Sequence, residues 1–331
     1  MLKYIIRRII YMIVLLAVLS VVSFLLIQLP PGDWVDTFIF QMKERGIIID
    51  EAMMRVLNKR FAFDQPVYRQ YLKWIGNIIL RGDFGESMEF NRPVAELLRG
   101  RLGLSVTLSL SSLFITYIIA VPVGIYSALR PYTLGDYTFT TLNFVGVATP
   151  NFMLALILMF VLQRGFGWSP GGLFSPKYLA APWSIGRIID LLKHLPVPLI
   201  VIATAGTAGL IRVLRSSLLD ELGKQYVITV RAKGVGEKRL LFKYPVRLAV
   251  NPIISGLAGL LPAIISGEAL VSIVLSLPTI GPLLIQGLRG QDQYLAASVI
   301  FILGALGMVG TLLSDLMLVL VDPRIRFERQ S

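Results

Sequence analysis

Two acidic side chains lie inside strongly apolar runs of this 331-residue sequence and are the first candidates for chemistry. Glu268 falls in the run 252–277, and Asp315 falls in the run 294–321. An ionised carboxylate at the centre of a bilayer costs about 3 kcal/mol, so it has to face water, a cavity or a polar partner. The two acids therefore predict a transport pathway or gate, with a purely structural hydrogen bond as the open alternative.

The sequence lacks the groups that hydrolysis or redox chemistry would need. It contains no cysteine and a single histidine, His194, which we expect at a membrane boundary. It has no Gly-x4-Gly-Lys-Ser/Thr loop to hold nucleotide phosphates, and one histidine does not make a Ser-His-Asp set. We therefore expect a protein that is not an enzyme, with no catalytic residue and no cofactor or metal of its own.

The composition predicts a membrane protein. Hydrophobic residues make up 55% of the chain and charged residues only 16%, which leaves too little polar surface for a soluble protein of this length. The net charge of +12 would suit nucleic acid, but the basic residues cluster beside apolar runs and are not interleaved with aromatic residues. We expect membrane lipid and no nucleic acid as a partner.

Six apolar runs predict an all-α, polytopic membrane protein with six transmembrane helices. The runs cover residues 9–29, 102–129, 138–162, 195–210, 252–277 and 294–321. Pro150 is expected to kink the third helix. The predicted organisation is a first transmembrane helix at 1–32, an extracytoplasmic cap segment at 33–101 and a five-helix permease core at 102–331. About 70 residues form only a marginal core, so the cap is expected to shield the entrance and not to bind substrate alone.

The polar stretch 212–247 separates two of these runs. It carries nine Lys or Arg residues and three acids, an imbalance typical of a cytoplasmic membrane loop. Together with the basic residues at both ends of the chain, it predicts that both termini are cytoplasmic. A short helix from Val227, two glycines at 234 and 236 that permit positive φ, and the apolar Leu240 to Phe242 favour a docking element over a flexible tether.

Several motifs carry a resemblance to a known family. Val230-Arg-Ala-Lys-Gly234, followed by Tyr244-Pro-Val-Arg-Leu-Ala-Val-Asn-Pro252, resembles the coupling loop of permeases from binding-protein-dependent ABC importers of the oligopeptide/dipeptide type. Thr149-Pro-Asn-Phe152, Ser276 to Pro282 and Asp322-Pro-Arg-Ile-Arg326 resemble other patterns of that family. The broader importer motif Glu-Ala-Ala is replaced here by Ile228-Thr-Val230.

The resemblance implies a type I importer permease in a prokaryotic inner or plasma membrane. It implies a second, homologous permease in a heterodimer, two ATPase subunits that bind ATP and Mg, and an extracytoplasmic substrate-binding protein. A stiff helix around 227–242 would fit a groove on an ATPase subunit and transmit its closure to the spans. The residues expected to contact the ATPase are Val227, Thr229, Arg231, Ala232, Lys233, Gly234, Leu240 and Phe242, and those expected at the pathway or gate are Pro150, Asn151, Pro262, Glu268 and Asp315.

The substrate and the energy source have open alternatives. The family carries di- and oligopeptides or oligosaccharides, and the Trp- and Gly-rich segment 165–193 either stacks on substrate or forms an interfacial aromatic belt. An ion-coupled secondary transporter would instead use Glu268 and Asp315, although the sequence shows no convincing internal repeat. A membrane scaffold without transport activity is the third possibility.

Overall fold

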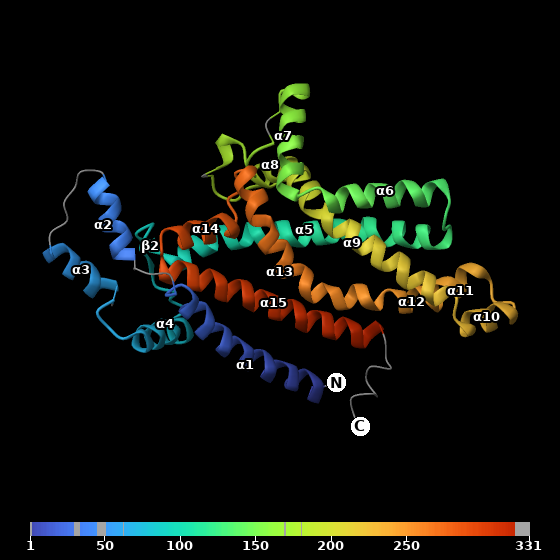
Figure 1. The fold of residues 1–331 in the computed structure, drawn as a ribbon, viewed down its shortest axis with the longest axis horizontal. Helices are drawn as coiled ribbons and strands as arrows, with labels where there is room; N and C mark the ends of the chain where they lie inside the picture. The colour runs from blue at the N-terminus through green and yellow to red at the C-terminus, as the bar shows by residue number, and fades with distance from the viewer. Residues whose placement is uncertain are drawn as a thin grey trace. The chain divides into compact units, whose positions relative to one another are not determined.

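A computed structural model describes residues 2–29, 34–44, 51–61, 63–168, 170–179 and 181–321. The chain forms two compact units, each made from two separate parts of the sequence. Unit 1 comprises Met1–Ser105 and Thr279–Leu306, and unit 2 comprises Val106–Pro278 and Gly307–Ser331. Helices α5 (Val94–Leu129) and α15 (Gln293–Val321) contribute residues to both units (Figure 1).

Unit 1 contains the first predicted span and the predicted cap. The span is α1 (Leu2–Leu26), which is followed by α2 (Trp34–Glu44), α3 (Glu51–Phe61) and α4 (Val67–Arg81). The turn after α4 passes through Gly82 and Gly85, both at positive φ, into a small antiparallel hairpin of β1 (Glu86–Ser87) and β2 (Arg92–Pro93). Helix α14 (Ile280–Arg289) and the first part of α15 complete the unit.

Aromatic side chains form the core of unit 1. Trp74 of α4 is fully buried beside Phe24 of α1, with ring centroids 5.3 Å apart, and Tyr71 donates or accepts a hydrogen bond with Ser20 at 2.8 Å. Helix α4 thus packs one face against α1, whereas Ile79 near its end is 74% exposed.

A buried carboxylate ties the hairpin of unit 1 to the last helix. Asp292 accepts a hydrogen bond from Leu295 N at 3.1 Å, which caps the amino end of α15. The same side chain accepts hydrogen bonds from the Ser87 hydroxyl at 2.5 Å and from Glu89 N at 3.1 Å. Burial raises the pKa of Asp292 above its usual value, and these hydrogen bonds offset only part of that rise. One side chain thus joins segments that lie about 200 residues apart.

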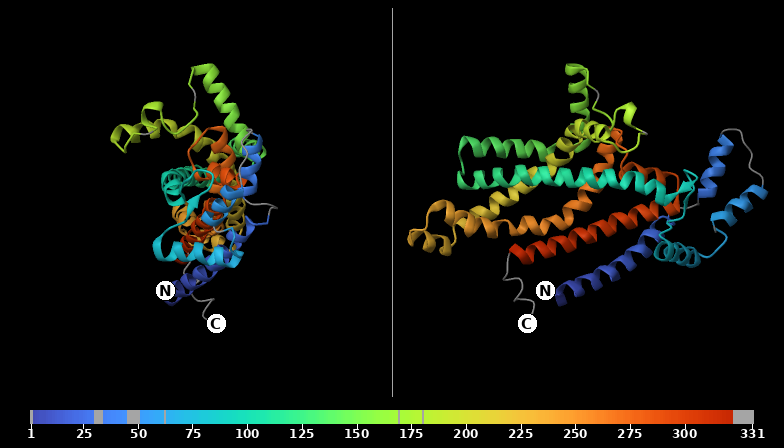
Figure 2. Two further views of the ribbon diagram at one scale, coloured as in Figure 1. Left: turned by 90° about the vertical axis from the view of Figure 1, so that its left-hand side faces the viewer. Right: turned by 180° about the vertical axis from the view of Figure 1, so that it is seen from behind.

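Unit 2 is built around α9 (Pro196–Leu222), which is the most buried of the four candidate spans found among the described residues. Around α9 pack α6 (Leu134–Ala148), α7 (Asn151–Phe166), α12 (Pro245–Ala249) and α13 (Asn251–Val274). A 3-10 turn at Pro176–Tyr178 and α8 (Ile185–His194) precede α9, while α10 (Gln225–Ala232) and α11 (Glu237–Lys243) follow it. Figures 1 and 2 show α10 and α11 at one end of the unit and α7 and α8 projecting near the other.

The third predicted span is two helices and not one kinked helix. Helices α6 and α7 meet at 102°, as a broken span or a re-entrant pair would. Pro150 has no N–H to continue the helix of α6, and it disfavours helical geometry in the residue before it. Thr149 is accordingly extended, at φ −90° and ψ 116°, and Pro150 lies immediately before α7.

Each predicted span coincides with helix in the structure. Among the described residues, helices α1, α5, α9 and α15 are long and apolar enough to cross a membrane. Helices α6 and α7 would make a fifth span if the bent pair is counted as a single span. The run 252–277 corresponds to α13, which has 24 residues, although the side chains of residues 258–268 lie outside the described set. The all-α polytopic class is confirmed.

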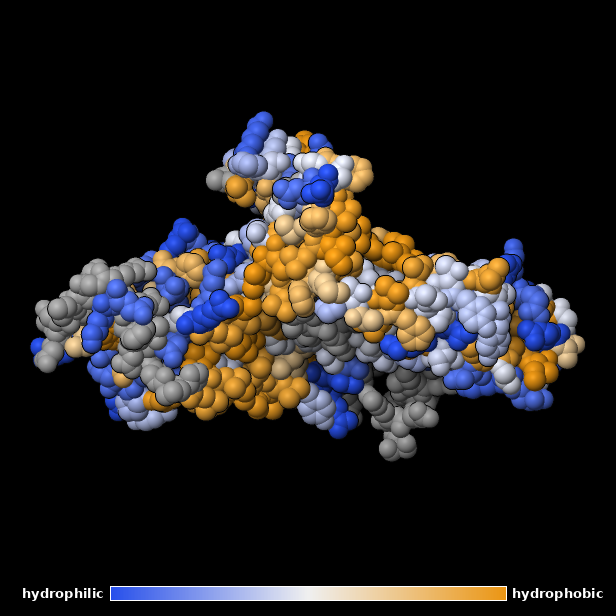
Figure 3. All heavy atoms as spheres, turned by 45° about the horizontal axis from the view of Figure 1, so that its top comes forward, coloured by the Kyte–Doolittle hydropathy of each residue, from blue (hydrophilic) through white to orange (hydrophobic). Residues whose placement is uncertain are grey.

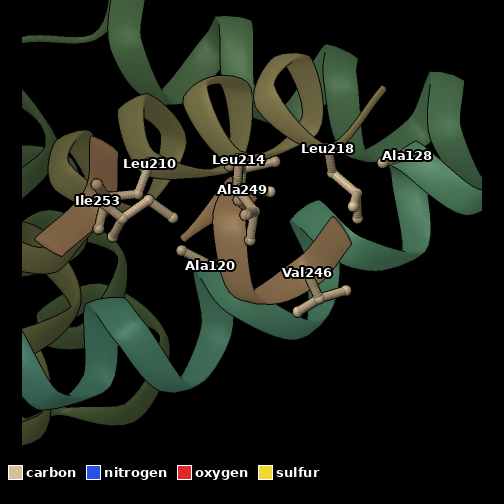
Figure 4. Packing of buried hydrophobic residues seen from close by; sticks show 9 residues of the cluster. Ala120, Ala128, Leu210, Leu214, Leu218, Val246, Ala249 and Ile253 are labelled. Carbon is tan, nitrogen blue, oxygen red and sulfur yellow. The ribbon is translucent and has the colours of Figure 1, made fainter. Parts of the chain in front are cut away.

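A small-residue crossing sets the distance between α5 and α9. A Cβ on Gly124 would lie 3.0 Å from both Cβ and Cδ2 of Leu214. Around this point Ala120 and Ala128 of α5, three leucines of α9 and residues of α12 and α13 form one buried cluster (Figure 4). Small residues that let helix backbones approach closely are typical of membrane helix packing.

We expect Gly124→Leu to lower the thermal unfolding midpoint of the detergent-solubilised chain, at a cost of about 1–3 kcal/mol for overpacking. The added side chain has to displace Leu214, which is fully buried. Gly100→Leu on the same helix is the matched control, because a Cβ at Gly100 meets nothing within 4 Å. Equal midpoints for the two variants would contradict this view of the crossing.

Candidate functional site

The basic stretch 212–247 forms a structured projection and not a tether. The chain leaves α9 at Leu222, forms the short helices α10 and α11, and returns through α12 into α13. Val246 and Ala249 of α12 are buried against α9 and α5 in the cluster of Figure 4. The projection therefore stands on the packed centre of unit 2, as a docking element requires.

Helices α10 and α11 form a hairpin, whereas the sequence suggested one stiff helix over 227–242. Gly234 lies between them at φ +75°, and its N–H donates to Arg231 O at 3.0 Å. This left-handed conformation ends α10, since residues with a Cβ rarely adopt it. The prediction of positive φ is confirmed for Gly234 and wrong for Gly236, which has φ −57° and caps α11.

An ion pair closes the hairpin. Arg231 Nε and Nη2 donate to the two carboxylate oxygens of Glu237 at 2.6 and 3.2 Å. The hydrogen bond and charge of Arg231 hold the pKa of Glu237 below its usual range, so the pair is ionised at neutral pH. Both side chains are about half exposed. Arg231, expected to contact a partner, thus also shapes the segment that carries it.

The expected contact residues divide into inward and outward sets. Val227 and Leu240 are fully buried within the chain, so they hold the hairpin together and do not lie on its surface. The apolar side chains exposed on the hairpin are instead Phe242, at 62%, and Ile228, at 49%, which was not among the expected contact residues. The helical spacing could have indicated that Ile228 is exposed, because it lies on the same face of α10 as Gln225, Thr229 and Ala232. The exposed members of the expected set are Thr229, Arg231, Ala232, Lys233, Gly234 and Phe242.

The surface of the hairpin is basic with apolar side chains interspersed. Lys233, Lys238, Arg239 and Lys243 are exposed on it. The space-filling view shows hydrophilic and hydrophobic side chains mixed at this end of unit 2, on the right (Figure 3). Such a surface suits a protein groove with acidic and apolar walls, because the cations orient the contact and the apolar side chains add affinity.

Polar contacts of Glu221 and Arg215 fix the base of the projection. Glu221, near the end of α9, accepts a hydrogen bond from the Tyr226 hydroxyl at 2.6 Å and pairs with Lys224. Earlier on α9, Arg215 Nε and Nη2 donate to Asp136 of α6 at 2.9 and 2.8 Å. Asp136 also accepts from Tyr132 N at 3.0 Å in the turn between α5 and α6. The α10–α11 end is therefore joined to α6 through side-chain contacts of α9.

The gate candidates are only partly placed by the structure. Pro150 and Asn151 lie at the bend between α6 and α7. Asp315 is partly buried on α15, next to Ser314, whose hydroxyl donates to Ile254 O of α13 at 2.6 Å. Glu268 and Pro262 belong to α13, but their side chains lie outside the described set. Whether these residues form a gate stays a prediction.

A pocket of about 240 Å³ lies between α6 and α9 and was not foreseen. Its polar lining comes from Thr140 and Asn143 of α6 and from Arg212, Arg215 and Ser216 of α9. Apolar side chains of the same helices supply most of the wall. The pocket therefore sets a few hydrogen-bonding groups within a mainly apolar surface.

Comparison with known proteins agrees with this architecture. Residues 120–327 match the family model "Binding-protein-dependent transport system inner membrane component", and residues 1–111 match its N-terminal companion. The oligopeptide transport system permease protein AppB of Bacillus subtilis is 36% identical over 99% of this chain and 100% of its own length. The peptidoglycan transport system permease protein YejB of Agrobacterium fabrum is 31% identical over 99% of each chain.

The oligopeptide transport system permease protein OppB of Mycobacterium bovis is 29% identical, over 98% of this chain and 99% of its own. These relatives lend no support to the ion-coupled alternative, since each is a permease of a transport system. The chain is a polytopic membrane component and belongs to the family of binding-protein-dependent transport system inner membrane components.

Proposed function

We propose that this chain is one permease subunit of an ATP-driven importer and forms half of the path that peptides take through the membrane. The observation that carries the proposal is the α10–α11 hairpin, an exposed basic and apolar projection joined to the end of α9 by the hydrogen bond between Tyr226 and Glu221. The sequence has no phosphate-binding loop, so energy comes from other subunits. The names of the relatives, two of them oligopeptide transport system permeases, favour peptides as substrate.

The proposed assembly has a second, homologous permease, two ATPase subunits with ATP and Mg, and an external binding protein that delivers the substrate. The exposed face of the hairpin enters a groove on an ATPase subunit, on the cytoplasmic side, with both chain termini on that side. ATP-driven closure then moves α10 and α11 as one body, because Arg231 and Glu237 hold them together. The contacts of Tyr226 and Arg215 pass the movement to α9 and α6.

The test is uptake by proteoliposomes that hold the full-length chain with the subunits that co-purify with it. We expect the preparation to contain an ATPase, and labelled oligopeptide to enter only when ATP and the binding protein are supplied. An excess of unlabelled oligosaccharide should leave peptide uptake unchanged. Uptake driven by a proton or sodium gradient without ATP would overturn the proposal, and so would purification with no ATPase subunit.

A further inference from the structure

Helix α8 (Ile185–His194) has its polar face turned toward the protein and its apolar face turned outward. Ile185, Ile188, Ile189 and Leu192 follow the spacing i, i+3, i+4 and i+7, and each is between 47 and 78% exposed. The opposite stripe, at the same spacing, consists of Arg187, Asp190, Leu191 and His194. Asp190 and Leu191 in this second stripe are buried. In a water-soluble protein the apolar stripe would face the core.

Contacts on the polar face fix this orientation. Asp190 accepts hydrogen bonds from both the backbone N and the hydroxyl of Ser175, at 2.7 Å each. The Arg187 guanidinium lies over the rings of both Phe174 and Trp183, 4.6 Å from each centroid, and donates to Ala181 O. Turning the apolar stripe inward would break all of these contacts and turn Asp190 away from Ser175.

The connection to α9 places α8 at a membrane boundary. Only Leu195 separates His194, at the end of α8, from Pro196, where the candidate span Pro196–Leu222 begins. In the left panel of Figure 2, α8 is seen along its length while α9 is foreshortened, and in Figure 1 the reverse holds. Helix α8 therefore lies across the direction of the span, at the level where the span ends.

The charge around α8 matches a phosphate surface. Residues 174–194 contain three cations, Lys177, Arg187 and Lys193, and a single acid, Asp190, which Ser175 already engages. Lys177 and Lys193 are exposed, and Trp183, two residues before α8, is 62% exposed. Tryptophan and long cationic side chains next to an apolar face are typical of helices that lie in the membrane interface.

We propose that α8 is an interfacial membrane helix that binds anionic lipid at the Pro196 end of α9. The stripe of Ile185, Ile188, Ile189 and Leu192 enters the boundary between headgroups and acyl chains, and Lys177 and Lys193 contact lipid phosphates. The segment 174–194 thereby fixes how deep α9 sits. The proposal is independent of what the protein transports. It also assigns the aromatic segment to the lipid interface, because Arg187 already occupies a face of Phe174 and of Trp183.

Spin labels on single cysteines test the proposal, since the natural chain contains no cysteine. The variants Ile188→Cys, Leu192→Cys and Lys193→Cys are made in the full-length chain and reconstituted, with the subunits that co-purify, into nanodiscs of phosphatidylethanolamine and phosphatidylglycerol. Collision with oxygen, which concentrates in lipid, is compared with collision with a water-soluble nickel complex. Lys193→Cys is the matched control, because it neighbours Leu192 but lies off the apolar stripe.

We expect the labels at 188 and 192 to favour oxygen by about threefold or more over the label at 193, as a depth difference across an interfacial helix implies. Replacing phosphatidylglycerol with phosphatidylcholine should reduce that ratio, since the phosphate contacts are then weakened. Stripe labels that favour the nickel complex would overturn the proposal, because the face would be in water. Labels that are immobile and shielded from both reagents would also overturn it, because a protein partner would then cover the face.

Discussion

Gly234→Pro is expected to abolish ATP-driven uptake by the reconstituted transporter while leaving membrane insertion intact. Gly234 has φ +75°, a region that costs an ordinary L residue about 1–2 kcal/mol and that proline, fixed near −65°, does not reach. Proline also removes the N–H that donates to Arg231 O. The hairpin would have to open, so we expect uptake to fall at least about tenfold, the factor that ~1.4 kcal/mol represents.

Gly236→Pro is the matched control for this prediction. Gly236 has φ −57°, close to the value that proline imposes, and a Cβ at this position meets nothing within 4 Å. We expect Gly236→Pro to retain most of the uptake and Gly234→Ala to lie between the two proline variants. Uptake and ATP hydrolysis are measured on the same proteoliposomes. Normal uptake by Gly234→Pro would refute the role proposed for the hairpin. Equal losses of uptake in both proline variants would show that the loss does not depend on the positive φ of Gly234.

Asp136→Ala is expected to lower the stability of the folded chain more than Gly124→Leu does. The substitution removes the acceptor of two hydrogen bonds from Arg215 and leaves that guanidinium, whose side chain is 27% exposed, without its carboxylate. Removing one partner of a buried ion pair costs about 3–5 kcal/mol, and the partial exposure of Arg215 places the expected cost near 3 kcal/mol. The measurement is the thermal midpoint of the detergent-solubilised chain, followed by tryptophan fluorescence.

Two further variants test whether the expected loss of stability comes from the burial of this ion pair or from the loss of any ion pair. Arg92→Gln removes one partner of the Arg92–Glu96 pair, in which both side chains are more than half exposed, and it should cost less than about 1 kcal/mol. The double variant Asp136→Asn with Arg215→Gln should recover part of the loss, because it leaves no unpaired charge. A midpoint for Asp136→Ala that equals that of Arg92→Gln would show that the contact between α6 and α9 contributes little.

Local sequence patterns predicted the spans and the place of the projection, because each depends on neighbouring residues. Apolar runs located α1, α5, α9, α13 and α15, and the excess of basic residues located the loop 212–247. The short helix before Gly234 could be predicted from the sequence for the same reason. Its division into two helices was harder to predict, since either glycine near the turn would permit positive φ.

The contacts that fix the site were not predictable, because they join residues far apart in the sequence. Arg215 and Asp136 are 79 positions apart, and each looks like one more charged loop residue when the chain is read alone. The inward position of Val227 and Leu240 likewise depends on the packing of α10 and α11 against the rest of the unit. The spacing of α8 shows an amphipathic helix, but only the structure shows which face is turned outward.

The link through Asp292 has a consequence for the order in which the protein matures. Its carboxylate accepts a hydrogen bond from the hydroxyl of Ser87, which lies 205 positions earlier in the chain. Unit 1 as a whole combines Met1–Ser105 with Thr279–Leu306. The first segments to leave the ribosome therefore cannot complete their fold until nearly the whole polypeptide has been synthesised. In the interval the aromatic core of unit 1 lacks its residues from Thr279–Leu306, such as the Phe301 that contacts Trp74, and an incomplete core that exposes apolar surface is prone to misassembly.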